Sequence, residues 1–357
     1  MKIMITGAAG FIGSAFARLA VSKGFTPVCV DKLSYAGDLE RLKSAADKIR
    51  FHKADIADKG AVGEIIKAEG PQAIVHFAAE THVDRSILDP GIFITANVIG
   101  TENLLELALR HGIKKFVHIS TDEVYGDLPA GDAKFLETDC LLPNSPYSAS
   151  KASADMFARA FRKTYDFPVI TVRPSNNYGP WQYPEKLIPL CIEKAMRGES
   201  IPLYGKGENI RTWLFVEDCA EAVMRVFEAG RAGETYNIGS SEEKTNRDVI
   251  SAILKHLGKD EKLVKNVPDR PGHDFRYAVD TAKIEKETGW RARTSFEEGI
   301  ERTVRWYSDH GDWLFRKAEE ARVFTDGLKR RFEELASLTP TLSHRERKEF
   351  RKRRGGG

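Results

Sequence analysis

The sequence predicts an α/β fold in which a doubly wound parallel sheet is followed by a smaller, loop-rich C-terminal domain. Short apolar segments alternate with helical patterns through the first half of the chain, and a glycine-rich turn follows the first of them. Repetition of strand, helix and strand is typical of a parallel sheet covered by helices on both faces. The length of 357 residues suits one large domain or two closely joined ones.

Five short segments rich in Val, Ile or Phe are the expected strands of this sheet. They comprise residues 2–6, 27–30, 73–77, 116–120 and 169–173. Helical patterns lie between these strands. In residues 101–111, for example, Leu104, Leu105 and Ala108 recur at helical spacing.

The second half of the chain loses this alternation. Residues 174–213 are rich in Pro, Gly, Tyr and Trp, which predicts loops. A strand is expected at 235–238, and helices at 247–257 and 295–307. We therefore expect residues 1–174 and about 209–239 to form the first domain, and about 175–208 with 240–320 to form the second.

The end of the chain has a different composition. Residues 318–338 could form a charged helix, and a basic run from His344 to Arg354 precedes three glycines. We expect residues 321–357 to form a charged, partly disordered tail. Contact of this tail with nucleic acid or an anionic surface is the minority interpretation.

Composition argues against several classes of protein. Much of the formal charge of +3 comes from the basic tail, so we expect no nucleic-acid partner. We find neither a signal peptide nor an apolar run of about 18 residues, which predicts a cytoplasmic protein outside the membrane. Four cysteines without metal or disulfide spacing are expected to be buried free thiols, and no metal site is expected. They are Cys29, Cys140, Cys191 and Cys219.

Three glycines, Gly7, Gly10 and Gly13, lie between the first expected strand and a helix. Glycines there permit a tight turn and let a helix N-terminus approach a pyrophosphate. Asp31 ends the second expected strand, where a carboxylate can accept hydrogen bonds from both adenosine ribose hydroxyls and repel a 2′-phosphate. The pattern predicts a Rossmann-type sheet that binds NAD rather than NADP. Asp55 could contact adenine or cap a turn, and the two interpretations are nearly level.

A tyrosine and a lysine four residues apart, Tyr147 and Lys151, are the next signal. Ser145 can cap a helix and Pro146 fits its first turn, so both side chains would lie on one helical face. The ammonium group favours the phenolate and lowers the pKa of the tyrosine, which can then act as a base. Thr121, at the end of an expected strand, would hydrogen-bond the reacting oxygen. Together these residues predict short-chain dehydrogenase chemistry.

Two adjacent carboxylates, Asp122 and Glu123, follow this threonine. Paired carboxylates can divide proton transfers, one as acid and one as base, when their pKa values differ. A simple dehydrogenase needs only the hydroxyl, the tyrosine and the lysine. The alternative is that the two carboxylates cap the short helix that follows.

Seven segments carry a resemblance that runs from Met1 to about Tyr307. They are DKLSYAG at 31–37, AAETHVDRS at 78–86, TDEVYG at 121–126, YSASK at 147–151, NNYGP at 176–180, PEKLIP at 184–189 and RPGHD at 270–274. Through these segments the chain resembles the dTDP-glucose 4,6-dehydratases of the extended short-chain dehydrogenase/reductase superfamily.

The resemblance implies a role for each catalytic residue. Tyr147 would take the proton from O4 of the sugar while NAD accepts hydride from C4. Glu123 would then remove the C5 proton, and Asp122 would protonate the departing C6 hydroxyl. Return of the hydride to C6 would give a 4-keto-6-deoxy sugar. The expected cofactor contacts are Gly7, Gly10, Phe11, Ile12, Gly13, Asp31, Lys32, Leu33, Ser34, Asp55, Ile56, Phe77, Ala78, Ala79, Asn97, Tyr147 and Lys151.

The resemblance also implies a nucleotide-sugar site and a partner. Arg211 and Arg270 could hold a diphosphate, and asparagine side chains could contact a pyrimidine base. A homodimer is implied, with a four-helix interface built from the helices near 101–111 and 146–164. The expected substrate contacts are Thr81, Thr121, Asn176, Asn177, Lys186, Leu187, Pro202, Tyr204, Arg211, Asn246, Arg270 and His273.

Two departures from the family pattern leave the nucleotide open between dTDP and UDP. Thr212 stands where the family more often has Asp, and the stretch from Asn246 to Arg270 is short. A UDP-glucuronate decarboxylase or a nucleotide-sugar 4-epimerase is the alternative activity, although neither needs an acid to expel the C6 hydroxyl. A non-catalytic NAD-sensing protein is the third alternative. It predicts loss of Tyr147 or Lys151, and both are present.

Overall fold

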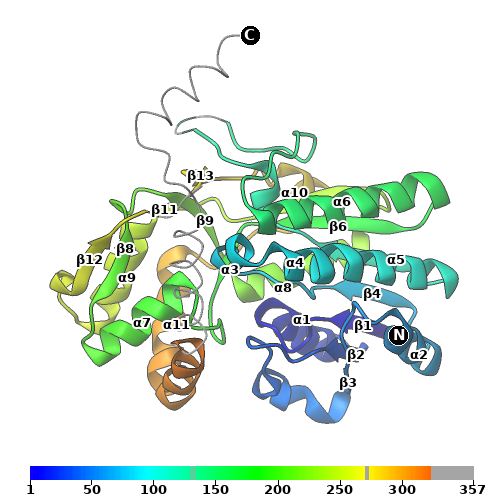
Figure 1. Ribbon diagram of the computed structural model, residues 1–357, viewed down its shortest axis with the longest axis horizontal. Coiled ribbons are helices and arrows are strands. Elements are labelled where there is room, and N and C mark those ends of the chain that lie inside the picture. Colours follow the sequence, from blue (N-terminus) through cyan, green and yellow to red (C-terminus); the bar gives the residue numbers. More distant parts are fainter. Residues whose placement is uncertain (130, 132, 270–272, 323–357) are drawn as a thin grey trace, which may run out of the picture.

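A parallel sheet of seven strands forms the centre of the larger part of the molecule (Figure 1). The computed structural model describes residues 1–129, 131, 133–269 and 273–322. From one edge to the other the strands follow the order β10-β6-β5-β4-β1-β2-β3. Their bounds are β1 (Lys2–Thr6), β2 (Thr26–Asp31), β3 (Arg50–Lys53), β4 (Ala73–His76), β5 (Lys115–Ile119), β6 (Val169–Pro174) and β10 (Thr235–Ile238). The order reverses between β1 and β4, and ligands of such sheets bind beyond the carboxyl ends of the strands at this point.

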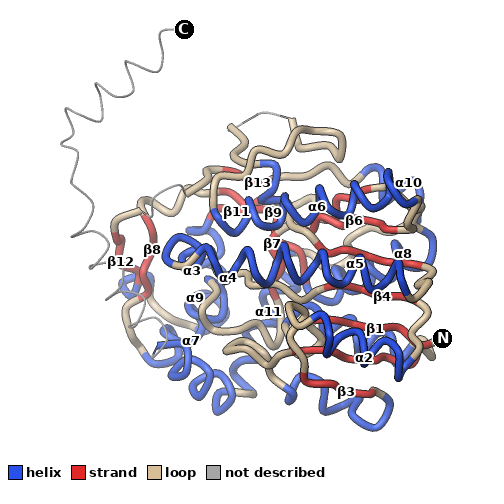
Figure 2. Tube along the Cα trace, turned by 45° about the vertical axis from the view of Figure 1, so that its right-hand side comes forward, coloured by secondary structure: helices blue, strands red, loops and turns tan. Residues whose placement is uncertain are grey.

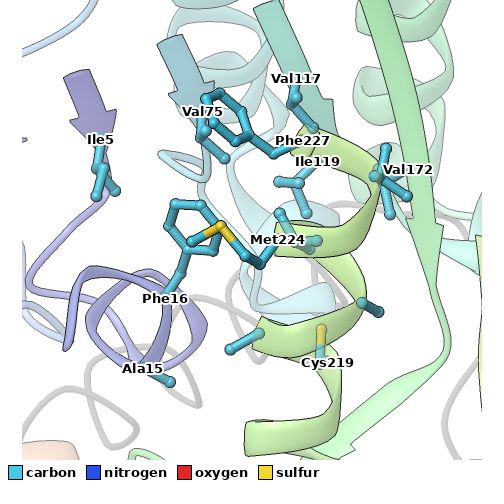
Figure 3. Close-up of a cluster of buried hydrophobic side chains, with 14 of the residues drawn as sticks. Ile5, Ala15, Phe16, Val75, Val117, Ile119, Val172, Cys219, Met224 and Phe227 are labelled. Atoms are coloured by element: carbon cyan, nitrogen blue, oxygen red, sulfur yellow. The ribbon is translucent and has the colours of Figure 1, made fainter. Parts of the chain in front are cut away.

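Helices cover both faces of this sheet, which confirms the doubly wound α/β prediction (Figure 2). On one face α1 (Phe11–Ser22) packs against α8 (Val216–Ala229). Figure 3 shows Phe16 of α1 and the α8 residues Met224 and Phe227 in one cluster with strand residues such as Val75. The opposite face carries α2 (Lys59–Glu69), α5 (Gly100–Arg110) and α6 (Pro146–Tyr165).

All the strands predicted for this sheet are present, and one further strand of the sheet was missed. The missed strand, β3, has the sequence RFHK and lies at the sheet edge, with both of its ends exposed. An edge strand that is exposed at its ends needs no continuous apolar run, and the sequence pattern therefore did not indicate it.

A long apolar helix precedes the central strand β5. It begins with α4 (Pro90–Phe93), passes through a π-helical turn, η2 (Ile94–Ile99), and continues as α5. The 21 residues Pro90–Arg110 are long and apolar enough to cross a membrane, so the expectation that no such run exists was wrong. However, 56% of its most apolar window is buried inside the protein, as in the core helix of a globular domain.

The smaller part of the molecule combines two small sheets with several helices. One sheet contains β7 (Asn176–Tyr178), β9 (Ile210–Phe215), β11 (Glu243–Thr245) and β13 (Arg276–Tyr277), and the other pairs β8 (Ile201–Tyr204) with β12 (Val264–Val267). Three helices enclose its own apolar core. They are α7 (Leu187–Arg197), α9 (Asn246–Leu257) and α11 (Phe296–Asp309). A further helix, α10 (Ala282–Thr288), packs against α8.

The prediction that residues 174–213 form loops was wrong, because α7 and three strands lie there. Helix α7 buries Ile188, Cys191 and Ile192 at helical spacing and ends at Gly198, whose backbone is left-handed. Pro189 lies in its first turn, where a proline is tolerated because that amide has no partner within the helix. The proline-rich flanks of the segment concealed this helix.

The boundary between the two parts differs from the expected one. Strand β9 pairs with β7, β11 and β13 in the smaller sheet, and the chain returns to the larger part at Val216, where α8 begins. We propose a division into a first domain of 1–175 and 216–240 together with α10, and a second domain built from the remaining segments up to about residue 310.

The helix at 311–322 contacts both parts of the molecule. Trp313 packs in the core of the smaller part, while its indole N–H donates to Asp38 of the larger part at 2.9 Å. The predicted charged helix is thus present as far as residue 322, and the predicted tail beyond it lies outside the described residues. Cys29, Cys191 and Cys219 are buried as expected. Cys140 is exposed, against expectation, because it lies in the loop that precedes α6.

Candidate active site

A cavity of about 300 Å³ opens beyond the carboxyl ends of β1 and β4 and extends toward the smaller domain. Many of the residues singled out from the sequence line it. They are Gly7, Gly10, Phe11, Ile12, Gly13, Asp31, Lys32, Ser34, Asp55, Ile56, Phe77, Ala78, Ala79, Thr81, Thr121, Asp122, Glu123, Tyr147, Lys151, Asn176, Asn177 and Lys186. Folding therefore brings the expected cofactor loop, the tyrosine, the lysine and the carboxylate pair into one site.

The glycine loop fits a dinucleotide pyrophosphate. Gly7 has a positive φ of 68°, and a Cβ added to it would lie 2.6 Å from the backbone nitrogen of Ala78. A Cβ on Gly13 would lie 2.2 Å from the carbonyl oxygen of Gly7. Helix α1 begins after Gly10 without a side-chain cap, so its first amide groups can donate to phosphate oxygens.

Asp31 is held rigidly at the end of β2. Its Oδ2 accepts from the amide of Ala9 at 3.0 Å, and its Oδ1 accepts from the amide of Leu33 at 2.8 Å. Burial raises the pKa of Asp31, while these two amides and Arg41 act in the opposite direction. Each carboxylate oxygen keeps a further lone pair that can accept from a ribose hydroxyl. Leu33 does not line the cavity and contributes its backbone amide.

Asp55 caps a turn and also lines the cavity. Its Oδ1 accepts from the amide of Ala57 at 2.9 Å, which is the turn-capping alternative, and the residue also lines the cavity. Lys32 lies 3.7 Å from Asp55 and 3.2 Å from Glu80. These contacts place charged groups along the adenosine side of the site.

Asn97 lies behind the cavity wall and does not line the cavity. Its amide group accepts from the backbone nitrogen of Glu80 at 2.8 Å and donates to the hydroxyl of Ser150, also at 2.8 Å. It thereby joins the loop after β4 to α6. Its role in the described structure is to support the cofactor site from behind.

Tyr147 and Lys151 project from the first turns of α6. Ser145 and Ser148 form a capping box at the start of this helix, and Pro146 is its first residue. The ammonium of Lys151 donates to the carbonyl of Ile119 at 2.6 Å. Burial lowers the pKa of Lys151 to about 8.

The pKa of Tyr147 differs from the sequence expectation. Burial and the negative charge of Glu123 raise it well above its usual range, and a hydrogen bond with Thr121 acts the other way. The sequence predicts the opposite, a pKa of Tyr147 that the lysine lowers. Desolvation dominates instead, because the phenol is 7% exposed and phenolate formation is disfavoured in a buried site.

The two carboxylates lie in the short 3₁₀ helix η3 (Asp122–Tyr125), directly after β5. They do not cap it, since the hydroxyl of Thr121 takes that position and accepts from the amide of Glu123 at 3.3 Å. Asp122 is 2% exposed, and burial together with Glu123 raises its pKa to about 8. The side chain of Asp122 is therefore favoured in its protonated form at neutral pH, as a proton donor requires.

The residues expected at the nucleotide fall into two groups. Asn176, Asn177 and Lys186 line the cavity, and Lys186 donates to the carbonyl of Thr81 at 3.0 Å. The second group lies at the start of α7, around β8 and β9, at the start of α9 and before β13, outside the cavity wall. It comprises Leu187, Pro202, Tyr204, Arg211, Asn246 and His273, while Arg270 lies outside the described residues.

Arg211 extends toward the Asp122–Glu123 pair. Its guanidinium donates to the carbonyls of Ile210, Phe275 and Asp274 at 2.7 to 3.1 Å. Its charge also lowers the pKa of Asp122, opposing the effect of burial. A diphosphate would have to compete with, or add to, these carbonyl contacts.

Several cavity residues had no individual signal in the sequence. Glu185 accepts from the hydroxyl of Tyr35 at 2.9 Å and lies 3.7 Å from His82. It therefore joins the smaller domain to two loops of the larger one beside the cofactor site. Arg41, which is 1% exposed, donates to the carbonyls of Ala9 and Ala36. Both residues were missed because their partners are distant in sequence or offer only backbone atoms.

Comparison with known proteins agrees with this site. Residues 4–303 match the family model described as GDP-mannose 4,6 dehydratase. A dTDP-glucose 4,6-dehydratase of Shigella flexneri is 49% identical over 341 residues, covering 88% of this chain and 94% of that protein. One of Streptomyces niveus is 47% identical over 321 residues, with the same coverage.

Solved structures give the same result. A dTDP-glucose 4,6-dehydratase of Streptomyces venezuelae, with NAD and dTDP bound, superimposes with a TM-score of 0.85 at 44% identity, covering 88% of this chain and 98% of that one. A UDP-glucose 4-epimerase of Thermus thermophilus in complex with NAD gives 0.81 at 30% identity, covering 86% and 99%. This chain belongs to the dTDP-glucose 4,6-dehydratase family of the extended short-chain dehydrogenase/reductase superfamily.

Proposed function

We propose that this protein is a hydro-lyase that converts dTDP-glucose to its 4-keto-6-deoxy derivative with NAD as a bound cofactor. Its similarity to dehydratases over most of the chain supports this activity. The observation that carries it is the Asp122–Glu123 pair beside Thr121, Tyr147 and Lys151, with Asp122 buried and favoured as an acid. An oxidation alone would not need the pair.

The glycine loop, the uncapped start of α1 and Asp31 would hold NAD, which supplies the acceptor for the C4 hydride and later returns it to C6. Tyr147 takes the proton of the O4 hydroxyl, and Thr121 hydrogen-bonds that oxygen. The resulting C4 ketone acidifies the C5–H bond. Glu123 removes the C5 proton while Asp122 protonates the C6 hydroxyl, which leaves as water.

Each catalytic group must regain its starting protonation state before the next turnover. Glu123 returns its proton to C5, and the proton that Tyr147 holds passes to solvent while Asp122 takes one up. The net change is the loss of one water from the sugar. Lys151 supports the phenolate of Tyr147 by its positive charge. Asn176, Asn177 and Lys186, which line the cavity, are proposed contacts of the nucleotide sugar.

A substrate panel tests this proposal. The protein would be incubated with dTDP-glucose, UDP-glucose and UDP-glucuronate, and the products identified by mass and by the keto-sugar absorbance in alkali. We expect a 4-keto-6-deoxy product, with dTDP-glucose turned over fastest. A 4-epimer or a decarboxylated sugar as the main product would replace the proposal by the corresponding alternative.

We further propose a homodimer formed by α6 and the helix that runs from α4 to α5. These helices pack side by side, and their outer surface is unusually apolar. On it Ile94 and Ile99 are 52% and 46% exposed, and Met156, Phe157 and Tyr165 are also exposed. Two copies of this surface would bury it in a four-helix interface.

Light scattering tests the dimer. Ile94→Glu should place a charge in the interface and yield a monomer at micromolar concentration. Leu39→Glu is the matched control, because Leu39 is 47% exposed but lies outside this surface, and it should remain dimeric. A monomeric unmodified protein would contradict the proposal.

We also propose that the protein lies in the cytoplasm, a reducing compartment that suits its unpaired cysteines.

A further inference from the structure

One buried carboxylate connects the two helices of the catalytic centre. Asp155 lies on α6 one turn beyond Lys151, on the same face of the helix. Its Oδ1 accepts from Nε2 of His118 at 3.1 Å, and its Oδ2 accepts from Nε of Arg173 at 2.9 Å. All these side chains are buried, so the contacts are shielded from solvent.

From Arg173 the contacts continue to the helix that carries the acid and the base. The Nη1 of Arg173 donates to the hydroxyl of Tyr125 at 2.8 Å, and this hydroxyl donates to Oδ1 of Asn237 at 2.7 Å. Tyr125 is the last residue of η3, which begins with Asp122. The chain of contacts thus joins α6, with its tyrosine and lysine, to η3, with its carboxylate pair.

The charges around Lys151 give Asp155 a second role. Burial lowers the pKa of Lys151, and the charge of Asp155 is the interaction that acts in the opposite direction. His118 on β5 and His76 on β4 face the same space, and burial lowers the pKa of both, so they are neutral. Arg173 on β6 is cationic, Tyr147 shares α6, and Glu123 and Asp122 lie on η3.

We infer that Asp155 is a positioning residue for the proposed reaction: it aligns α6 with η3 and places a negative charge one helical turn from Lys151. The inference rests on the proposed function. Asp155 lies behind the catalytic groups and outside the cavity lining, so it acts through Lys151 and Arg173 rather than on the sugar. Without the charge of Asp155, the burial that disfavours protonation of Lys151 would lose the interaction that opposes it.

The test isolates the oxidation step. All variants are made in the full-length, NAD-loaded protein that carries Asp122→Asn. After addition of dTDP-glucose, reduced cofactor should form and persist in this background. Its rate of formation is measured by absorbance at a series of neutral and alkaline pH values. Adding Asp155→Asn should move the alkaline limb of this rate to lower pH by about one unit. Residues four apart on a helix lie about 5–6 Å apart, and an opposite charge about 4–6 Å away shifts a pKa by about 1–3 units. Adding Asp155→Glu instead should move the limb by less.

Tyr125→Phe in the same background is the matched control. It breaks the contacts of Arg173 and Asn237 with the Tyr125 hydroxyl without changing a charge. The melting temperature should fall, as for the loss of any buried hydrogen bond, but the alkaline limb should stay in place. If the alkaline limb of the pH–rate profile moves equally in Tyr125→Phe and Asp155→Asn, the shift is caused by altered packing and the inference is overturned.

An alkaline limb unchanged by Asp155→Asn would also overturn the inference. If that variant fails to fold, Asp155→Ser takes its place with the same expected shift, since a smaller side chain leaves room for water beside His118 and Arg173. Failure of the background itself is a different result. If Asp122→Asn forms no reduced cofactor with dTDP-glucose, the proposed function is wrong, whatever the role of Asp155.

Discussion

The two helices of the catalytic centre differ in how they hold their functional groups. Helix α6 has 20 residues, a capping box and an extensive buried face, and it carries Tyr147 and Lys151 in its first turns. Helix η3 has four residues and a single hydroxyl cap, and it carries Asp122 and Glu123. The oxidation groups thus belong to a rigid element, whereas the dehydration groups depend on their neighbours for position. The comparison suggests that the two half-reactions can be separated by substitution.

The largest expected effect is on α6. Tyr147→Phe removes the base of the oxidation step and keeps the ring packing. Turnover should fall by about 10⁴-fold, the upper range for a positioned general base, and no reduced cofactor should appear after addition of substrate. Stopped-flow absorbance measures both. Accumulation of reduced cofactor in this variant would show that another group takes the O4 proton.

On η3, Glu123→Gln should stall the reaction after oxidation. Turnover should fall by about 10³-fold, because C5–H would lack its base, while reduced cofactor still forms. In deuterated water the unmodified enzyme should exchange the C5 position, and this variant should not. Deuterium at C5 in Glu123→Gln, found by mass spectrometry, would assign the base to a different residue.

The pKa of Asp122 predicts how the rate of water loss depends on pH. Burial and Glu123 raise this pKa to about 8, and a general acid acts only while protonated. Water loss should therefore be independent of pH below about 8 and fall about tenfold per unit above it. Pre-steady-state measurement of water loss across pH tests this. A rate that falls as the pH decreases through the same range would indicate that Asp122 acts as a base.

The smallest expected effect lies away from both helices. Asp31→Asn keeps at most one of the two contacts, to Ala9 or to Leu33, because an amide has a single acceptor oxygen, and it removes the charge that would face the ribose. Binding of NAD, which should be tight in the unmodified protein, should weaken by about tenfold, the range for a hydrogen bond to a charged group. Discrimination against NADP should decrease. Calorimetric titration with both dinucleotides tests this, and an NADP preference in the unmodified protein would contradict the role of Asp31.

How much of the structure the sequence could predict depends on how far apart in the chain the contacting residues lie. The turn at Gly7, the cap at Ser145 and the spacing of Tyr147 and Lys151 depend on residues within one strand–turn–helix or one helix, so local pattern suffices. The parallel sheet follows from repetition of such units. The structure contains these features, and the ends of the helices and strands differ from the predicted ends by one or two residues.

Contacts between distant segments could not be found in this way. Glu185 meets Tyr35 across 150 residues of sequence, and Asp155 meets His118 across 37. No periodicity marks either pair. The same limitation explains why the pKa of Tyr147 was misjudged, since its value depends on burial and on Glu123, which approaches only in the folded chain. Helix α7 was missed for a local reason, the prolines that flank it and the one within its first turn.

The separation of the two half-reactions is tested most directly by Asp122→Asn, which keeps the size of the side chain and removes the acidic proton. On mixing the NAD-loaded variant with dTDP-glucose, we predict that absorbance of the reduced cofactor appears at the normal rate and then persists. Formation of the keto-sugar should be slower by about 10²–10⁴-fold. Turnover at the rate of the unmodified enzyme, without accumulation of reduced cofactor, would contradict the account and favour an epimerase or decarboxylase.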